Sequence, residues 1–182
     1  MIREFSIHAN PTNKKAMTAF TVCFFSSFAT LFGSTLLSRY RGVVGLVGMG
    51  LLVAAILLYT KFISSKYFYE IAHDTEGTPL FVVNQLIGKR MTTLCRVGLH
   101  EIVKVESESL KERNEHKTPA GVKKYNYVPT LLPERTCRIY TSGRHERAEI
   151  VIEVTSEVAN MILSYAEEAR ELMVAREAAE EF

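Results

Sequence analysis

Hydrophobic residues are unevenly distributed along this chain, which has two long apolar runs near its start. The first extends from about Ala16 to Leu37 and the second from about Val43 to Ile63. At roughly 1.5 Å per residue, a helix of about 20 residues crosses the ~30 Å hydrocarbon layer of a bilayer. A helix also satisfies its own backbone hydrogen bonds in lipid. The pattern therefore predicts two transmembrane helices within residues 16–63.

A short polar turn joins the two runs and predicts an antiparallel helical hairpin. It reads Ser-Arg-Tyr-Arg-Gly over residues 38–42. A cleaved signal peptide is the alternative for the first run, because Lys14 and Lys15 precede it. The apolar core of a signal peptide is about 7–15 residues long, however, and here a second apolar run follows at once. The sequence therefore favours the hairpin.

Basic residues predict the orientation of this hairpin. Five lie on its two flanks and two lie in its turn. Lys and Arg accumulate on the cytoplasmic side of membrane proteins. We therefore expect a cell-membrane protein with two spans and both termini in the cytoplasm, residues 1–15 forming a short cytoplasmic segment. The flanking residues are Arg3, Lys14, Lys15, Lys61 and Lys66, and those of the turn are Arg39 and Arg41.

Small residues suggest how the two helices touch. Ala29 and Gly33 are four residues apart in the first run, as are Gly50 and Ala54 in the second. Pairs with this spacing allow helices to approach closely in lipid. Because Ala29 and Gly50 lie at similar depth, we expect these four residues to form the helix–helix contact.

Neither run contains Asp, Glu or His, and Lys61 lies near the end of the second. Ion and proton pathways usually need ionisable groups within the membrane. Transport by this chain alone is therefore disfavoured. An accessory subunit of a transport complex remains possible, with contacts on the face that carries Gly45 and Gly48.

After residue 66 the hydrophobic period changes from that of a helix to that of a strand. Alternating apolar and polar residues over 67–154 predict about five to seven antiparallel strands. The clearest hairpin joins residues 135–141 to 147–154, with Glu149 and Glu153 opposite the apolar positions. A helix over about 156–178 follows, capped by Thr155 or Ser156.

This terminal helix is amphipathic. We expect Tyr165 and Leu172 to be buried where the helix covers one open end or face of the sheet. Its apolar stripe comprises Val158, Ile162, Tyr165, Ala169 and Leu172 or Met173.

Charge is divided between the two parts of the chain. Residues 1–66 carry seven Lys/Arg and one Glu, a net charge of +6, whereas 67–182 carry 15 basic and 19 acidic residues, a net charge of −4. Nucleic-acid affinity depends largely on neutralising phosphates. Nucleic-acid binding by the soluble domain is therefore disfavoured.

No pattern of catalytic or metal-binding residues is present. The three cysteines lack CxxC spacing, the five histidines are scattered, and the usual phosphate-binding and hydrolase motifs are missing. Cys95 and His100 are five residues apart, but no third group is available to orient them as a nucleophile and base. We therefore expect neither an enzyme nor a bound cofactor or metal.

The charge-dense stretch over residues 106–124 is predicted to be an exposed loop interrupted by Pro119 and Gly121. Its lysines, with others along the chain, are candidate contacts for anionic lipid headgroups. Acidic neighbours in the loop would cancel part of that attraction. The candidates are Lys61, Lys66, Lys89, Arg90, Lys117, Lys123 and Lys124.

Two segments resemble the bacterial pleckstrin-homology-like (PH-like) domains of small membrane proteins. Residues 98–106, GLHEIVKVE, are similar to that family's turn-plus-strand pattern, and residues 125–133, YNYVPTLLP, precede the hairpin and helix. The resemblance covers roughly 67–175 and implies a partly open barrel of two packed sheets closed by a helix, without catalytic residues. Eukaryotic pleckstrin-homology domains often bind phosphoinositides through a basic first hairpin loop, but the matching turn here, residues 74–77, is acidic, so this mode of binding is not carried over.

The sequence thus predicts a two-helix membrane hairpin followed by an α+β domain at residues 67–182. Three functions fit this organisation. The first is a non-enzymatic, membrane-anchored interaction module that docks a protein partner or a second copy through a sheet edge or the 106–124 loop. The second is a peripheral sensor of anionic lipid, and the third is the accessory transport subunit.

Overall fold

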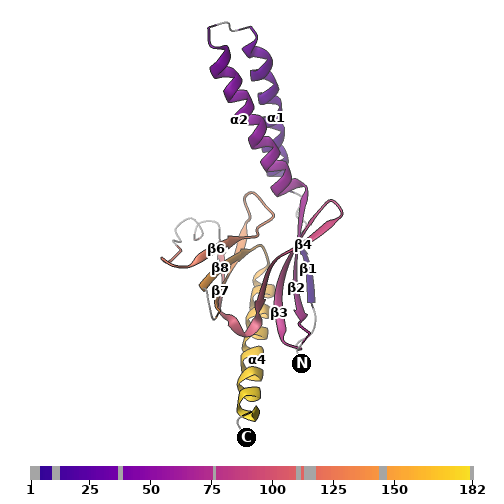
Figure 1. Cartoon of the computed structure of the whole chain (residues 1–182), viewed down its shortest axis with the longest axis vertical. Coiled ribbons are helices and arrows are strands. Elements are labelled where there is room, and N and C mark those ends of the chain that lie inside the picture. Colours follow the sequence, from indigo (N-terminus) through magenta and orange to yellow (C-terminus); the bar gives the residue numbers. More distant parts are fainter. Residues whose placement is uncertain are drawn as a thin grey trace. The chain divides into compact units, whose positions relative to one another are not determined.

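The computed structural model describes residues 5–9, 13–36, 39–75, 77–109, 112, 118–143 and 147–180. It divides into two compact units. One contains residues 11–65, and the other combines residues 1–10 with residues 66–182 (Figure 1). The second unit is therefore discontinuous in sequence, because the helical unit is inserted between its first and second strands.

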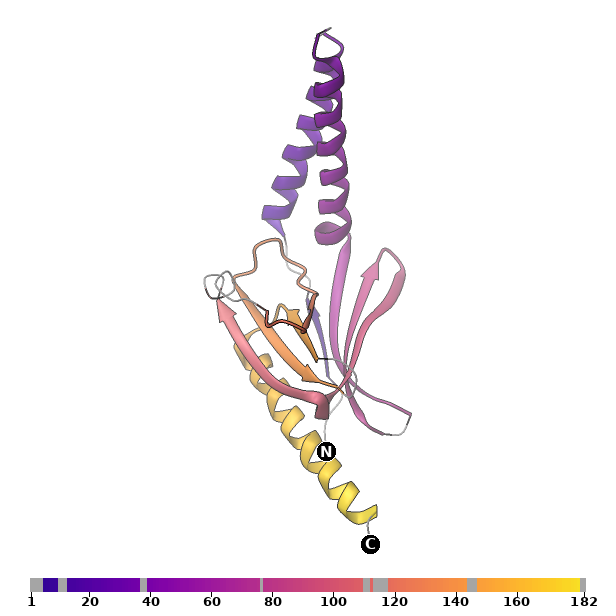
Figure 2. The same cartoon turned by 60° about the vertical axis from the view of Figure 1, so that its left-hand side comes forward.

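The helical unit is a pair of helices lying side by side (Figures 1 and 2). Helix α1 spans Lys14–Ser34 and helix α2 spans Arg41–Leu58, followed by a π-helical turn, η1, at Tyr59–Ile63. Both helices are long and apolar enough to span a membrane. The Asn13 side chain caps α1 by accepting a hydrogen bond from the Ala16 amide at 3.1 Å. Leu37, the expected end of the first run, lies outside the described residues.

The contact between the helices differs from the expected one. Gly48 is buried against α1, and a Cβ added there would lie 2.8 Å from both Leu31 Cγ and Thr30 Oγ1. Ala29 and Gly50 are exposed instead, and a Cβ at Gly33 or Gly50 would meet no atom within 4 Å. The prediction that Ala29 and Gly50 form the close approach is therefore wrong.

Helical periodicity explains this difference. At about 100° per residue, Gly50 lies on the side of α2 opposite Gly48. The other buried residue of α2, Ala55, follows Gly48 by seven residues and shares its face. Ala54 is half-buried at the border of that face. The accessory-subunit hypothesis is also affected, because Gly48 is already covered by α1.

In the described part of the chain, the second unit contains two four-stranded sheets. The first has the order β1-β2-β3-β4 and the second the order β5-β7-β8-β6. The pairs β1–β2, β3–β4, β5–β7 and β7–β8 are antiparallel, whereas β6 and β8 are parallel. The strands are β1 Phe5–Ala9, β2 Ser65–His73, β3 Pro79–Ile87, β4 Arg90–Gly98, β5 Ile102–Ser109, β6 Lys123–Asn126, β7 Arg135–Ser142 and β8 Arg147–Ile152.

Strand β1 comes from the segment that was expected to stand apart from the soluble domain. It pairs with β2 in antiparallel register, with Phe5 opposite Ile71 and Ile7 opposite Tyr69. Phe5 packs against the core, which lies between the sheets. The residues before α1 and those after α2 therefore belong to one sheet.

Helix α4, at Ser156–Glu180, packs against β5 and the short 3₁₀ helix η2 at Leu99–Glu101. Its buried residues are Ala159, Ile162, Ala166 and Ala169, with Tyr165 half-buried. Leu172, predicted to be buried, is 53% exposed. The buried stripe continues from Ala169 to the half-buried Met173, which leaves Leu172 to one side.

The stretch over residues 106–124 is only partly a loop. Strand β5 continues to Ser109, and β6 begins at Lys123. The expectation of a fully exposed loop is therefore wrong at both ends. Most of residues 110–117 lies outside the described part of the chain, and this includes Lys117.

Replacing Gly48 with Leu tests the observed helix contact. The added side chain would overlap Leu31 and Thr30, so we expect a loss of about 1–3 kcal/mol in the free energy of unfolding. The measurement is denaturation of the full chain in mixed detergent micelles, followed by far-UV circular dichroism. Gly50→Leu is the matched control and should leave stability nearly unchanged. Equal losses in the two variants would contradict this helix contact.

Candidate binding cleft

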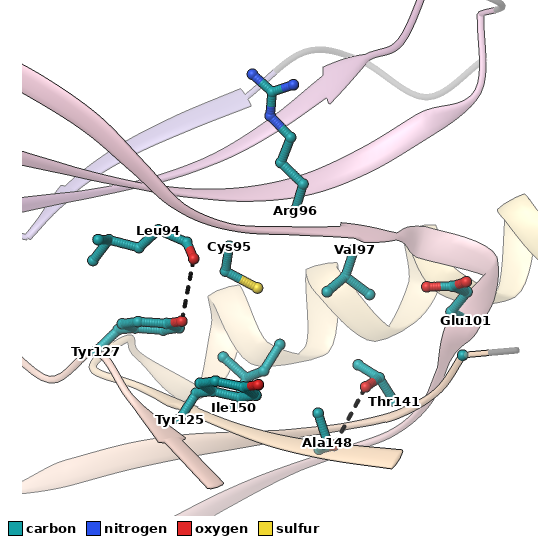
Figure 3. Close-up of a pocket in the computed structure, with 11 residues that line it drawn as sticks. Leu94, Cys95, Arg96, Val97, Glu101, Tyr125, Tyr127, Thr141, Ala148 and Ile150 are labelled. Atoms are coloured by element: carbon teal, nitrogen blue, oxygen red, sulfur yellow. Dashed lines mark hydrogen bonds between the residues drawn. The ribbon is translucent and has the colours of Figure 1, made fainter. Parts of the chain in front are cut away.

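A cleft of about 550 Å³ opens between the two sheets of the β unit. One wall is the last strand of the first sheet, β4, and the other is formed by β6, β8 and the residue that follows β6 (Figure 3). Both β4 and β6 are edge strands. The cleft therefore lies where neither sheet is continued by a further described strand. Its lining includes Leu94, Cys95, Val97, Tyr125, Tyr127, Thr141, Ala148 and Ile150.

A β-bulge shapes the β4 wall. Val83 pairs with Cys95 and Asn84 pairs with Thr93, so Leu94 is the extra residue. A bulge of this kind re-aims side chains and bends the strand locally. Leu94 and Cys95 are consecutive and both line the cleft. Figure 3 shows the side chains of Cys95 and Val97 directed toward the opposite wall and that of Arg96 directed away.

Two stacked tyrosines form much of the opposite wall. The rings of Tyr125 and Tyr127 have centroids 6.2 Å apart and planes 10° from parallel. The Tyr127 hydroxyl donates to the Leu94 carbonyl at 3.4 Å, and the Tyr127 carbonyl accepts a hydrogen bond from the Tyr69 hydroxyl at 2.8 Å. Burial raises the pKa of Tyr127 to about 12, with smaller contributions from Cys95, Tyr125 and Tyr67. Tyr127 is therefore a neutral hydrogen-bond donor fixed at the end of the cleft.

The cleft offers binding groups and no activated nucleophile. Its one sulfur, Cys95, has a pKa raised by burial, which favours the unreactive thiol over the thiolate. His100, considered as its partner, is not among the lining residues. Within the described residues no group of three or more His, Cys, Asp or Glu side chains is placed to hold a metal ion.

The edge of β4 presents backbone groups to an incoming strand. The Leu94 carbonyl points toward the open edge, since it accepts from Tyr127 across the cleft. Backbone groups of successive strand residues alternate in direction. If alternation resumes after the bulge residue Leu94, the N–H and C=O of Arg96 face the same open edge, and this is the prediction that substitution at Arg96 tests. These are the groups that an added extended peptide uses.

A cluster of charged side chains lies on the face of the second sheet that points away from the cleft. The side chains of Arg138 and Glu149 are fully buried and form an ion pair, and Arg138 also pairs with Glu108, which is 11% exposed. Lys124 reaches the Glu149 carboxylate at 3.2 Å. Alternation correctly placed Glu149 opposite Ile150, and the structure shows in addition that its carboxylate is buried.

The charged states of this cluster stabilise one another. Burial alone would lower the pKa of Arg138, but hydrogen bonds and the charges of Glu108 and Glu149 outweigh burial and raise it. Burial likewise favours the neutral form of Glu149. Hydrogen bonds from Thr118 and Lys124 and the charges of Lys124 and Arg138 outweigh this effect and lower its pKa. The cluster joins β5, β7, β8 and β6, so we assign it a structural role.

The candidate lipid contacts fall in separate places. Lys89 and Arg90 lie together at the turn between β3 and β4, both exposed. Lys66 is exposed on β2, Lys61 is exposed in η1, and Lys117 is not described. Lys123 and Lys124 lie on β6, where Lys124 is engaged by Glu149. Of the candidate lysines in the 106–124 stretch, the two that the structure describes, Lys123 and Lys124, therefore belong to a strand and not to a loop.

Comparison with known proteins gives no assignment: no protein-family model matches the chain, and no curated protein matches it. Any function must therefore be argued from the geometry of the chain itself. The cleft is the feature that the sequence did not identify as a site, whereas Lys89 and Arg90 of the β3–β4 turn were among the candidate lipid contacts. The alternation of β4 and the tyrosines of 125–127 are visible in the sequence, but their apposition requires the fold.

The Arg138 cluster predicts a specific dependence of stability on pH. The pKa of Glu149 is lower in the folded chain than its ordinary 4.5, so its charge stabilises the fold above that pH. This stabilisation is lost as the pH falls through the lower folded-state pKa. In thermal unfolding of the full chain in detergent, the gap between wild type and Glu149→Gln should be largest near neutral pH and shrink on acidification.

An exposed carboxylate provides the control for this measurement. Glu134 lies just before β7 and is exposed, so Glu134→Gln should track the wild type at every pH. A gap between wild type and Glu149→Gln that stays constant from neutral to acidic pH would show that the Glu149 charge does not contribute in this way.

Proposed function

We propose that this chain is a non-enzymatic, membrane-anchored interaction module. In this proposal, α1 and α2 cross the cell membrane as a hairpin, and the β unit is a PH-like domain held at the cytoplasmic face. The inter-sheet cleft takes up an extended peptide segment of a partner protein along the β4 edge. The observation that carries the proposal is the coexistence of an apolar-surfaced helix pair with a β unit whose open cleft has binding groups.

The exposed surface of the helix pair supports membrane insertion. Only 11% of the most apolar stretch of each helix is buried within the structure. In water, exposing so many large apolar side chains would oppose folding, whereas lipid is as apolar as they are. Side-chain hydroxyls on α1 donate to carbonyls of their own helix, as from Ser27 to Phe24 and from Ser34 to Leu31. Exposed apolar residues include Val22, Phe25, Phe32, Leu46, Val53 and Ile56.

The pairing of β1 with β2 supports the hairpin topology. One strand precedes α1 and the other follows η1 after a single residue, Ser64. Strands of one sheet must occupy the same aqueous compartment, so the number of membrane crossings between them is even. The Lys and Arg residues on the two flanks favour the cytoplasm as that compartment.

Two packed sheets followed by a C-terminal helix are the arrangement that the PH-like resemblance implies. Strand β1 and the parallel pair β6–β8 are additions to what the resemblance predicts. The turn between β2 and β3 corresponds to the first hairpin loop of the resemblance. Its described residues include Asp74 and no Lys or Arg. Recognition of a phosphoinositide headgroup there is not part of the proposal.

The β4 edge is the docking surface best supported by the geometry. An extended segment added there would bond to the outward N–H and C=O of Arg96 and place alternate side chains in the cleft. Val97, Ile150 and Ala148 supply apolar surface, and the tyrosines supply flat aromatic surface. Rim charges are mixed, with Arg96 and Glu101 both present, so backbone pairing and shape provide more of the affinity than charge does.

Membrane anchoring and topology are tested by extraction and labelling. We expect the full chain to remain in the membrane pellet after alkaline carbonate treatment, since its helices are held by lipid. With Cys95 replaced by Ala, cysteines introduced at Ser6 and at Lys66 should react with an impermeant thiol reagent only from the cytoplasmic side. Release by carbonate, or labelling of the two positions from opposite sides, would contradict the proposal.

Proline and alanine substitutions at Arg96 test peptide docking at the β4 edge. Extended peptides are selected from a displayed library against the full chain in detergent, with Arg96→Ala and Arg96→Pro for comparison. Proline has no backbone N–H, and an edge strand tolerates proline at a position whose N–H would face the open edge. Arg96→Pro should therefore keep the fold but remove one hydrogen bond to the peptide, so we expect peptide affinity to fall more than tenfold. Arg96→Ala keeps this N–H and should keep most of the affinity.

Far-UV circular dichroism of both variants controls for folding. The selected peptides should also fail to bind the Val97→Lys variant, because the lysine side chain would place a charge in the cleft. If no peptide is retained by the wild type, or if Arg96→Pro and Arg96→Ala bind equally, the β4 edge is not the docking surface.

A further inference from the structure

The hairpin formed by β3 and β4 ends in a turn that is both apolar and basic. Ile87 is 47% exposed and Met91 is 54% exposed, and Lys89 and Arg90 lie between them. Within the described residues, neither Lys89 nor Arg90 has an ion-pair partner. We propose that this tip, residues 86–91, inserts as a wedge into the interface of an anionic lipid bilayer.

The geometry of the turn places apolar side chains on both faces of the ribbon. Ile87 pairs with Arg90 and Leu86 pairs with Met91, so the two pairs lie on opposite faces. Gly88, with φ +61°, takes the first turn position, which fits a two-residue type II′ hairpin. A protein groove would cover one face of such a ribbon. A fluid lipid interface covers both.

The charges of the tip select the chemistry of that interface. Lys89 lies in the turn and Arg90 is the first residue of β4. Each cation close to an anionic leaflet is attracted by roughly 1 kcal/mol. Their aliphatic stems extend along apolar surface while the charged ends stay among headgroups. Half-exposed apolar residues next to cations, as Ile87 and Met91 are next to Lys89 and Arg90, are also a feature of interfacial segments.

The position of the tip within its own sheet agrees with this role. Gln85, next to the tip on β3, donates from its amide to the Tyr67 hydroxyl on β2 at 3.1 Å. Tyr67 follows Ser65, the first residue of β2, by two positions, and Lys66 between them is exposed. The tip therefore lies at the same end of the sheet as the first residues of β2, and β2 follows η1 after Ser64 alone. Lys66 adds a third cation at this end.

The inference rests on the proposed membrane anchoring but goes beyond it. An anchored β unit need not touch lipid, whereas this proposal requires that one named hairpin does. It also replaces the expected broad basic surface by a compact one, since Lys124 is paired with Glu149.

The test places an environment-sensitive fluorophore on the tip of the full chain in lipid nanodiscs. Cys23 and Cys95 are replaced by Ala, while Cys137 is fully buried with a pKa raised to about 12 and does not react. The dye is attached at Ile87→Cys. Val103→Cys is the matched control, because Val103 is a comparably exposed apolar residue on β5.

We expect the Ile87 probe to emit at shorter wavelength and to be quenched by spin-labelled lipid in nanodiscs containing phosphatidylglycerol, and less so in phosphatidylcholine alone. The Val103 probe should report water in both. Lys89→Gln with Arg90→Gln should lower the inserted population roughly tenfold or more. Their neutral side chains preserve the length of the tip, so folding is not at issue.

Three outcomes would overturn the inference. The Ile87 probe could report water in anionic nanodiscs, or its response could be independent of lipid charge and of the two substitutions. It could also depend on protein concentration instead of lipid, which would mean that a second copy covers the tip. Incorporation of the chain into nanodiscs is measured separately. If the chain incorporates but the tip does not insert, only the tip proposal is wrong. If the chain does not incorporate, the proposed membrane anchoring is wrong.

Discussion

The antiparallel pairing of β1 with β2 is the constraint on which the rest of this structure depends. It joins a strand before the helix pair to a strand after it, with Phe5 and Ile7 opposite Ile71 and Tyr69. The helical unit is thereby an insertion in a β domain, and both of its ends return to one sheet. A fragment that begins at residue 65 would leave β2 with an unpaired edge and remove the contact of Phe5 with the core. The β unit therefore needs the residues on both sides of the helical unit.

The two faces of the second sheet are specialised by different interactions. Its inner face contributes Ile139, Ile150 and Ile152 to the core. Its outer face holds the Arg138 cluster, whose members come from all four strands and whose buried charges are costly unless every partner is in place. Such a cluster specifies strand order more than it adds stability. Its Lys124–Glu149 ion pair adds a side-chain contact to the parallel pair β6–β8, and Tyr125 of β6 with the following Tyr127 forms the wall that faces β4 across the cleft.

The sequence predicted the structure correctly where a hydrophobic pattern fits only one kind of element. Two apolar runs predicted two helices, and alternation predicted the β7–β8 hairpin and the face of Glu149. It did not predict the structure where several residues suit the same contact equally well. Gly45, Gly48 and Gly50 all suit a close helix contact, and only the partner helix selects Gly48. Alternation assigns Glu149 to the outer face but does not reveal that this face is covered. Five residues at the N-terminus gave too short a pattern to predict β1, whose pairing with β2 is non-local.

The proposed membrane attachment would change how much affinity each surface needs. A tethered domain meets its lipid and any neighbouring membrane partner at a high effective concentration, so contacts that are weak in solution become sufficient. A tip with two cations and two half-exposed apolar residues would bind a bilayer poorly as a free domain. In a β unit whose strand β2 follows η1 after the single residue Ser64, the same tip would need only to bias the orientation of the unit. That bias would determine whether the β4 edge and its cleft are accessible to a partner. Lipid contact and peptide docking would then be coupled through one rigid sheet, because β4 carries both the tip and the cleft wall.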